Sequence, residues 1–222
     1  LDTGGVGIEA LRLGFSKAFP QQYSERTFPT LELGGATDSG LVKKLFGHYG
    51  IKESKQSAGE FFRHYLSFLE PALIDSFAMS KGRQLPGVTD LVEILNSMGH
   101  HLGLLTGNIE DGARLKLRHY GISESQFVVG AFGDDHYDRN QLGPIAIERA
   151  EAHYSKTFDP AEQVIIIGDT LKDIACARAC GAKVVAVATG AHDYETLHKA
   201  KPDFLFEDFS DPHRVLTSIG LV

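Results

Sequence analysis

The chain has 222 residues, a length that suits one domain with an insertion or two small domains and allows a proper hydrophobic core. Its 22 basic and 29 acidic side chains leave a net charge of −7, which argues against a broad nucleic-acid or membrane-surface footprint. No apolar run approaches the roughly 20 residues that span a bilayer, so we expect a cytoplasmic protein with neither nucleic acid nor membrane as a partner.

The first third of the chain is patterned as helices. Apolar side chains recur at helical spacing in three stretches, and no stretch there reads as a strand. The three stripes are Ile8, Leu11, Phe15 and Phe19; Leu41, Val42, Leu45, Phe46 and Tyr49; and Phe61, Phe62, Tyr65, Leu66, Leu69 and Leu73. We therefore expect an all-helical unit over residues 6–80, in which Asp38 caps the helix that follows the loop Leu33–Asp38.

After Leu85-Pro86-Gly87 the pattern changes to short apolar strands that alternate with helices. Strands are expected at His101–Leu105, Phe127–Val129, Val164–Ile167, Lys183–Ala188 and Asp203–Phe206. Helices are expected at Val88–Met98, Glu110–Tyr120, Ile145–His153, Asp173–Cys180, Tyr194–Lys199 and Pro212–Ile219. Strands that are apolar throughout are typical of a parallel sheet covered by helices on both faces. The predicted fold is α/β, a doubly wound Rossmann-like parallel sheet formed by residues 1–5 and 81–222, with the helical unit inserted ahead of it.

Two of the expected strands end in residues that can bind a charged ligand. Thr106-Gly107-Asn108 can offer a hydroxyl and backbone N–H groups to a phosphate, although such residues are also common in plain strand-to-helix turns. Asp169 and Asp173 are carboxylates four residues apart, and hard oxygen ligands of this kind suit Mg²⁺. The alternative for Asp173 is that it only favours the helix N-terminus. Ligands of doubly wound sheets bind beyond the carboxyl ends of the strands, so both groups are site candidates.

These two strand ends together resemble the haloacid dehalogenase superfamily, in the subgroup that carries a helical cap after the first strand. The resemblance rests on Gly168-Asp169-Thr170-Leu171-Lys172-Asp173 after a hydrophobic strand, on Leu105-Thr106-Gly107-Asn108 and on the re-entry at Leu85-Pro86-Gly87, and it covers essentially the whole chain. It implies a cap domain over 6–80 and a magnesium-dependent phosphatase. In such enzymes an aspartate at the end of the first strand attacks phosphorus, and water hydrolyses the resulting aspartyl phosphate.

The resemblance also implies roles for individual residues. Asp169 would be a metal ligand, Asp173 a supporting or water-mediated one, and Thr106 would hydrogen-bond the phosphoryl oxygens. Gly35, Thr37 and Asp38 resemble the cap loop that meets the substrate in relatives acting on phosphoglycolate or sugar phosphates. The expected substrate-binding set is Gly35, Thr37, Thr106, Gly107 and Asn108. An ordinary interhelical turn is the alternative for this loop.

The nucleophile motif of the family, DxDGT after an apolar strand, is absent. Leu1-Asp2-Thr3-Gly4-Gly5 resembles the segment between that motif and the cap, and nothing ahead of Asp2 can form a central strand. We therefore expect that the sequence starts after the first strand. The strands at His101–Leu105 and Val164–Ile167 should then flank a slot of two strand spacings, about 9–10 Å.

The lysine that the family usually places within KPxP is also absent. Alignment back from Ile145 puts Asn140 at that position with Arg139 beside it, which makes Arg139 the candidate catalytic partner of the phosphate. A guanidinium is not geometrically equivalent to an ammonium, and a surface arginine is the alternative.

The function predicted from the sequence is that of a magnesium-dependent hydrolase of a small phosphorylated metabolite, similar to phosphoglycolate phosphatase, acting as a monomer or homodimer. A β-phosphoglucomutase-like phosphotransferase is one alternative. A non-catalytic fragment or binding module is the other, because the nucleophile segment is missing.

Overall fold

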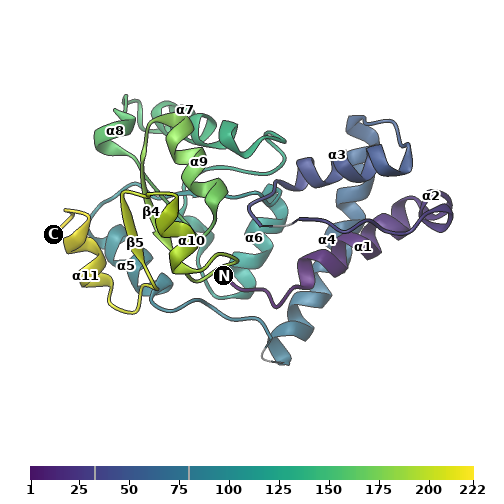
Figure 1. Cartoon of the computed structure of the whole chain (residues 1–222), viewed down its shortest axis with the longest axis horizontal. Coiled ribbons are helices and arrows are strands. Elements are labelled where there is room, and N and C mark those ends of the chain that lie inside the picture. Colours follow the sequence, from purple (N-terminus) through teal and green to yellow (C-terminus); the bar gives the residue numbers. More distant parts are fainter. Residues whose placement is uncertain (33, 80) are drawn as a thin grey trace.

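Helices at one end of the molecule make up the first part of the described chain (Figure 1). The computed structural model describes residues 1–32, 34–79 and 81–222. Its first elements are α1 (Val6–Ala18), α2 (Pro20–Glu25), α3 (Asp38–Tyr49) and α4 (Lys55–Ala78). Leu33, at the start of the expected cap loop, and Ser80, at the end of the expected helical unit, lie outside the described residues.

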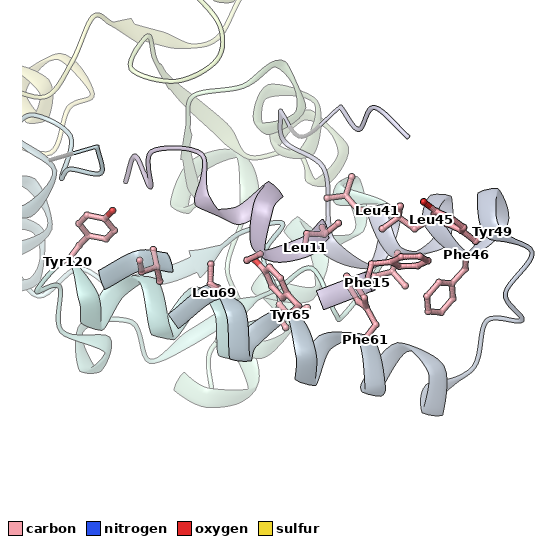
Figure 2. Packing of buried hydrophobic residues seen from close by; sticks show 14 residues of the cluster. Leu11, Phe15, Leu41, Leu45, Phe46, Tyr49, Phe61, Tyr65, Leu69 and Tyr120 are labelled. Carbon is pink, nitrogen blue, oxygen red and sulfur yellow. The ribbon is translucent and has the colours of Figure 1, made fainter. Parts of the chain in front are cut away.

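The apolar stripes of these helices meet in one aromatic-rich core, shown in Figure 2. Phe15 of α1 is fully buried, and its ring lies 4.5 Å from that of Tyr49 on α3 and 6.2 Å from that of Phe61 on α4, measured between centroids. Aromatic pairs at these separations add to the burial of apolar area. The core continues into the following part of the chain through Ile109 and Tyr120, so the helices are packed against the strand-containing part.

One expected helix cap is wrong. Thr37, and not Asp38, is the N-cap of α3, since its hydroxyl accepts a hydrogen bond from the Gly40 N–H. Asp38 is instead the first helical residue, and its carboxylate accepts from the Ile109 N–H at 2.9 Å. Threonine and aspartate both serve as N-caps, so the composition of the loop did not distinguish them, and the contact with a residue 71 positions away decided the arrangement.

Strands and helices alternate in the rest of the chain. Its strands are β1 (Gly103–Leu105), β2 (Val129–Ala131), β3 (Ile165–Gly168), β4 (Lys183–Val187) and β5 (Phe204–Phe206). Its helices are α5 (Val88–Ser97), α6 (Glu110–His119), α7 (Leu142–Tyr154), α8 (Pro160–Gln163), α9 (Leu171–Cys180), α10 (Tyr194–Lys199) and α11 (Pro212–Ser218), with 3₁₀ turns η1 (Glu124–Gln126) and η2 (Arg139–Gln141). The mixed α/β fold with parallel strands confirms the predicted fold class.

The strands form two separate parallel sheets. β1 pairs with β2, and β4 lies between β3 and β5. Within the described residues β1 and β3 are not hydrogen-bonded to each other, in agreement with the expected slot, whose width stays a prediction. Ile167 of β3 is 39% exposed although its strand neighbour Ile166 is buried, which is what an unpaired, uncovered sheet edge produces.

Two expected boundaries moved for local reasons. The strand expected at Phe127–Val129 begins only at Val129, because η1 precedes it and Val129 is the first residue in register with β1. α7 begins at Leu142, three residues before the expected start, because Pro144 falls in its first turn, where proline is tolerated.

Candidate functional site

A cavity of about 560 Å³ lies between the ends of β1 and β3. Leu104 and Leu105 of β1 form part of one wall, and Ile167 and Gly168 of β3 form part of another. The residues after both strands reach it, as the chemistry-bearing residues of parallel sheets do. Of the predicted site residues, the structure brings these into its lining: Gly35, Thr106, Gly107, Asn108, Arg139, Asp169 and Asp173.

Three side chains beyond β1 form a chain of hydrogen bonds. The Lys116 ammonium donates to Asn108 Oδ1, and Asn108 Nδ2 donates to Thr106 Oγ1 at 2.8 Å. The Asn108 backbone N–H donates to the same hydroxyl at 3.2 Å. A threonine hydroxyl has two acceptor sites and one proton, so both acceptor sites are used. Among the described residues its proton has no acceptor, which leaves it available to a ligand in the cavity.

Asp173 holds together the loop after β3. Its Oδ1 accepts from Arg139 Nε at 3.1 Å and Nη2 at 2.6 Å, and the two side chains are only 5% and 12% exposed. Its Oδ2 accepts from the backbone N–H groups of Asp169 and Thr170 and from the Thr170 hydroxyl at 2.7 Å. With Thr170 it forms a capping box at the start of α9. Both carboxylate oxygens are therefore occupied by donors.

These contacts bear on two predicted roles. Asp173 would have to release donors to bind a metal directly, so its contacts favour the supporting role over direct coordination. Arg139 lines the cavity, but its charge is already paired with Asp173. The metal role of Asp173 and the phosphate role of Arg139 both stay predictions.

Asp169 presents a carboxylate that has no such partners. Within the described part of the chain it makes no ion pair. Burial, together with the charge of Asp173, raises the pKa of its carboxyl above the usual value. The close approach of its Oδ2 to Gly190 requires glycine there, since a Cβ would lie 2.0 Å from that oxygen. Asp169 is thus a carboxylate whose environment favours a nearby cation.

The loop of the helical unit closes over the end of β1. The Asp38 N–H donates to the Gly107 carbonyl at 2.6 Å, and the Ser39 N–H donates to the Gly133 carbonyl at 3.2 Å. Gly107 is needed for this approach, because a Cβ on it would lie 1.9 Å from the carbonyl oxygen of Ala36.

Gly35 lies in the cavity wall with a positive φ of 65°, whereas Thr37 is 2% exposed and donates its hydroxyl proton to the Tyr137 carbonyl. The predicted substrate role of Thr37 is untested, and these contacts weigh against it.

Of the two charged residues Lys116 and Asp38 of the cavity wall, the sequence analysis missed Lys116 as a site candidate. Lys116 lies on the face of α6 that also carries the buried Gly112, Ala113 and Leu117. Burial lowers the pKa of the Lys116 ammonium, opposed by the charge of Asp38, and burial raises the pKa of Asp38. A lysine within an otherwise apolar helical stripe was the available signal, and it calls for a partner or a ligand.

The described residues contain no group of three or more His, Cys, Asp or Glu side chains arranged as a metal site. A metal at Asp169 would therefore need further ligands from water, substrate or another carboxylate, which Mg²⁺ accepts readily. None of the helices in the described ranges is both long and apolar enough to cross a membrane.

Comparison with known proteins gives concordant matches. Residues 140–212 match the family model described as HAD-hydrolase-like. The chain is 27% identical over 124 residues to pyrophosphatase PpaX of Bacillus pumilus, covering 56% of this chain and 55% of that protein. It is 31% identical over 134 residues to phosphoglycolate phosphatase of Synechococcus elongatus, covering 60% of this chain and 59% of that protein. The chain thus spans a little over half the length of these curated relatives.

The solved structures show the same fold over nearly the whole chain. A hydrolase from Pseudomonas syringae superposes with a TM-score of 0.64 at 20% identity, covering 96% of this chain and 92% of that one. Family model, sequence relatives and fold agree with the two strand-end motifs. The chain is thus similar to haloacid dehalogenase-like hydrolases in the family model that matches residues 140–212, in the curated relatives and in its fold.

Proposed function

We propose that this protein is a magnesium-dependent phosphatase that hydrolyses a small phosphomonoester in the cytoplasm through an aspartyl-phosphate intermediate, as phosphoglycolate phosphatase-like enzymes do. One observation carries the proposal. A carboxylate without a partner, Asp169, and a hydroxyl with a free proton, Thr106, line the same cavity from two different strand ends.

The nucleophile of the proposal is an aspartate on a strand seated between β1 and β3. Each of these strands pairs on one side only among the described residues, so each has a free edge. Asp2 does not suit the role. Its backbone pairs with Arg83, its Oδ1 accepts from the Gly4 N–H at 2.9 Å, and it is not part of the cavity lining.

The reaction proceeds in two displacements. A carboxylate oxygen of the nucleophile forms a bond to phosphorus while the ester P–O bond breaks, and the leaving alcohol takes a proton from a second aspartate, which stands two residues after the nucleophile in the DxDGT motif. Water then attacks phosphorus and gives a proton to that aspartate, while the bond between phosphorus and the carboxylate oxygen of the nucleophile breaks, so that inorganic phosphate leaves and the free carboxylate is restored. Thr106 donates its free hydroxyl proton to a phosphoryl oxygen and so holds the group in line with the nucleophile.

The residues present fit Mg²⁺ through one ligand. Asp169 supplies a carboxylate whose charge is otherwise poorly compensated, and Asp173 fixes the loop that carries it by accepting from the Asp169 N–H. When bound, the ion would offset negative charge on the nucleophile and on the phosphoryl oxygens.

The test is hydrolysis of p-nitrophenyl phosphate and 2-phosphoglycolate by the polypeptide of the complete reading frame. We expect turnover that requires Mg²⁺ and is abolished by Asp169→Ala, with unchanged circular dichroism. Asp193→Ala is the matched control, an exposed aspartate at the N-cap of α10, and it should keep wild-type turnover. Turnover that persists in chelator, or in Asp169→Ala, would contradict the metal role.

Two other functions are outcomes of the same assay. Conversion of a sugar phosphate to its isomer without release of phosphate would identify a β-phosphoglucomutase-like phosphotransferase. Binding of phosphate without turnover of any ester would identify a non-catalytic module.

A further inference from the structure

Lys116 is the least expected side chain in the cavity wall. It extends from α6 on the same face as Ala113 and Leu117, which are 6% and 7% exposed. A position on this stripe would ordinarily be apolar, because an ammonium loses hydration there. The residue nevertheless lines the cavity together with Thr106 and Asp169.

The ammonium of Lys116 is not neutralised by a direct contact. Its one described hydrogen bond goes to the amide oxygen of Asn108, a neutral acceptor, and an ammonium has three donors. In the described part of the chain no carboxylate lies within 4.0 Å of it. Asp38 is close enough to influence its charge, but the carboxylate of Asp38 accepts instead from the Ile109 N–H.

Arg139, a second basic residue of the cavity wall, is already paired with a carboxylate. Arg139 donates twice to Asp173, and this pair carries no net charge toward the cavity. Recruiting Arg139 to a phosphate would leave Asp173 buried without its counter-ion, which is costly. Lys116 can bind an anion without breaking any ion pair.

We propose that Lys116 is a catalytic residue whose ammonium binds the phosphoryl oxygens of the substrate, in the place that the sequence had assigned to Arg139. Asn108 links it to Thr106, so the ammonium and the Thr106 hydroxyl address neighbouring oxygens of one phosphoryl group. The inference rests on the proposed function and deepens it. Since charge on these oxygens must be stabilised during transfer, a fixed cation there lowers the barrier.

The electrostatics of the site agree with this role. Burial lowers the pKa of Lys116, because removal from water disfavours the charged ammonium. A bound phosphate supplies the missing negative charge and stabilises it. A merely structural lysine would instead be expected to carry its counter-ion in direct contact.

The experiment is calorimetric titration of inorganic phosphate, with Mg²⁺ present, into the complete polypeptide. Three forms are compared, namely wild type, Lys116→Met and the control Lys44→Met, which removes an exposed lysine of α3. Methionine keeps the length of the chain without its charge. A charge-assisted hydrogen bond is worth enough to predict at least about tenfold weaker binding for Lys116→Met. Lys44→Met should bind as wild type does.

The outcomes separate the two proposals. A wild type that does not bind phosphate would overturn the proposed function, and the role of Lys116 with it. A wild type that binds phosphate, with Lys116→Met equally tight, would overturn the role of Lys116 alone.

Competitive acetylation of the wild-type protein covers the case in which Lys116→Met does not fold. Phosphate should protect Lys116 from acetic anhydride and leave Lys44 equally reactive. Equal labelling of Lys116 with and without phosphate would overturn its role.

Discussion

The ends of β1 and β3 face one cavity but present opposite kinds of groups to it. Beyond β1 stand hydrogen-bond donors with protons to spare, the Thr106 hydroxyl and the Lys116 ammonium. Beyond β3 stands a carboxylate without a counter-ion, Asp169. One edge thus suits an anion and the other a cation, which is the division of labour that a metal-assisted phosphoryl transfer requires.

The difference arises from the helix that comes after each strand. α9 begins at once after β3, so Asp173 lies in its first turn, where backbone N–H groups and Arg139 satisfy it. α6 begins later after β1, at Glu110, and delivers a lysine from its second turn back toward the strand end. The paired charges of Asp173 and Arg139 hold the loop after β3 in place. The charges of Asp169 and Lys116, which make no ion pair within the described residues, are available to a ligand.

The largest change in the free energy of unfolding should come from the loop after β3, where Asp173 is fully hydrogen-bonded. Asp173→Ala leaves the Arg139 guanidinium buried without its partner and removes the capping box of α9. Truncating one partner of a buried ion pair costs about 3–5 kcal/mol of unfolding free energy. Urea denaturation at pH 7 measures it.

The control for Asp173→Ala is Glu9→Ala, which removes an exposed partner of Arg12 and should cost less than about 1 kcal/mol. Adding Arg139→Met to Asp173→Ala should recover part of the loss. If Asp173→Ala were as mild as Glu9→Ala, the account of the β3 loop would be wrong.

A smaller effect is expected on the donor side. Thr106→Val keeps the shape of the side chain but leaves the Asn108 amide without its acceptor. An unsatisfied, partly buried donor costs about 1–3 kcal/mol. Thr106→Ser retains the hydroxyl and should remain close to wild type in the same denaturation measurement. Equal stability of the valine and serine variants would show that the hydrogen bonds linking Lys116, Asn108 and Thr106 contribute nothing to the free energy of unfolding.

The smallest expected effect is a gain of stability on replacing Asp169 by asparagine. Because the pKa of Asp169 is raised in the folded state, the folded protein holds this proton to higher pH than the unfolded chain does. Stability therefore falls as pH rises from the unfolded value of about 3.9 through the folded pKa, and the cost is complete above it. Asp169→Asn should raise the melting temperature at pH 7 in chelator by no more than about 4 °C.

This gain should vanish at pH values below the unfolded pKa, where the carboxyl is neutral in both states. The pKa of Asp193 is lowered by its hydrogen bonds with Thr196, so ionisation of this carboxyl stabilises the folded state. Asp193→Asn should therefore not gain stability. A loss of stability in Asp169→Asn at pH 7 would show that a counter-ion within the protein already satisfies this carboxylate.

Much of this arrangement could be predicted from the sequence. Apolar runs that close on Thr106 and on Asp169 mark strand ends, and parallel strands bring their carboxyl ends to one edge. The rest depended on contacts between distant positions. Thr37 caps α3 in place of the expected Asp38, because the Asp38 carboxylate accepts a hydrogen bond from the Ile109 N–H. Arg139 and Asp173, which form an ion pair, are 34 residues apart in the sequence. Local patterns do not carry such information.

Lys116 shows the same limit from another side. Its helix was predicted, and its place on the apolar stripe could have been inferred from the helical period. Its role as a site residue depends on the position of α6 against the end of β1, which brings its ammonium to Asn108. Only the tertiary packing distinguishes a lysine that reaches solvent along the helix from one that reaches a cavity.

The claim that the end of β1 binds an anion and the end of β3 a cation is tested most directly by a crystal structure of the complete polypeptide with Mg²⁺ and tungstate, a heavy analogue of phosphate. We predict the metal against Asp169 and the oxyanion against Lys116 and Thr106, with the pair between Arg139 and Asp173 intact. An oxyanion bound by Arg139, with Asp173 released and Lys116 turned away, would contradict the account.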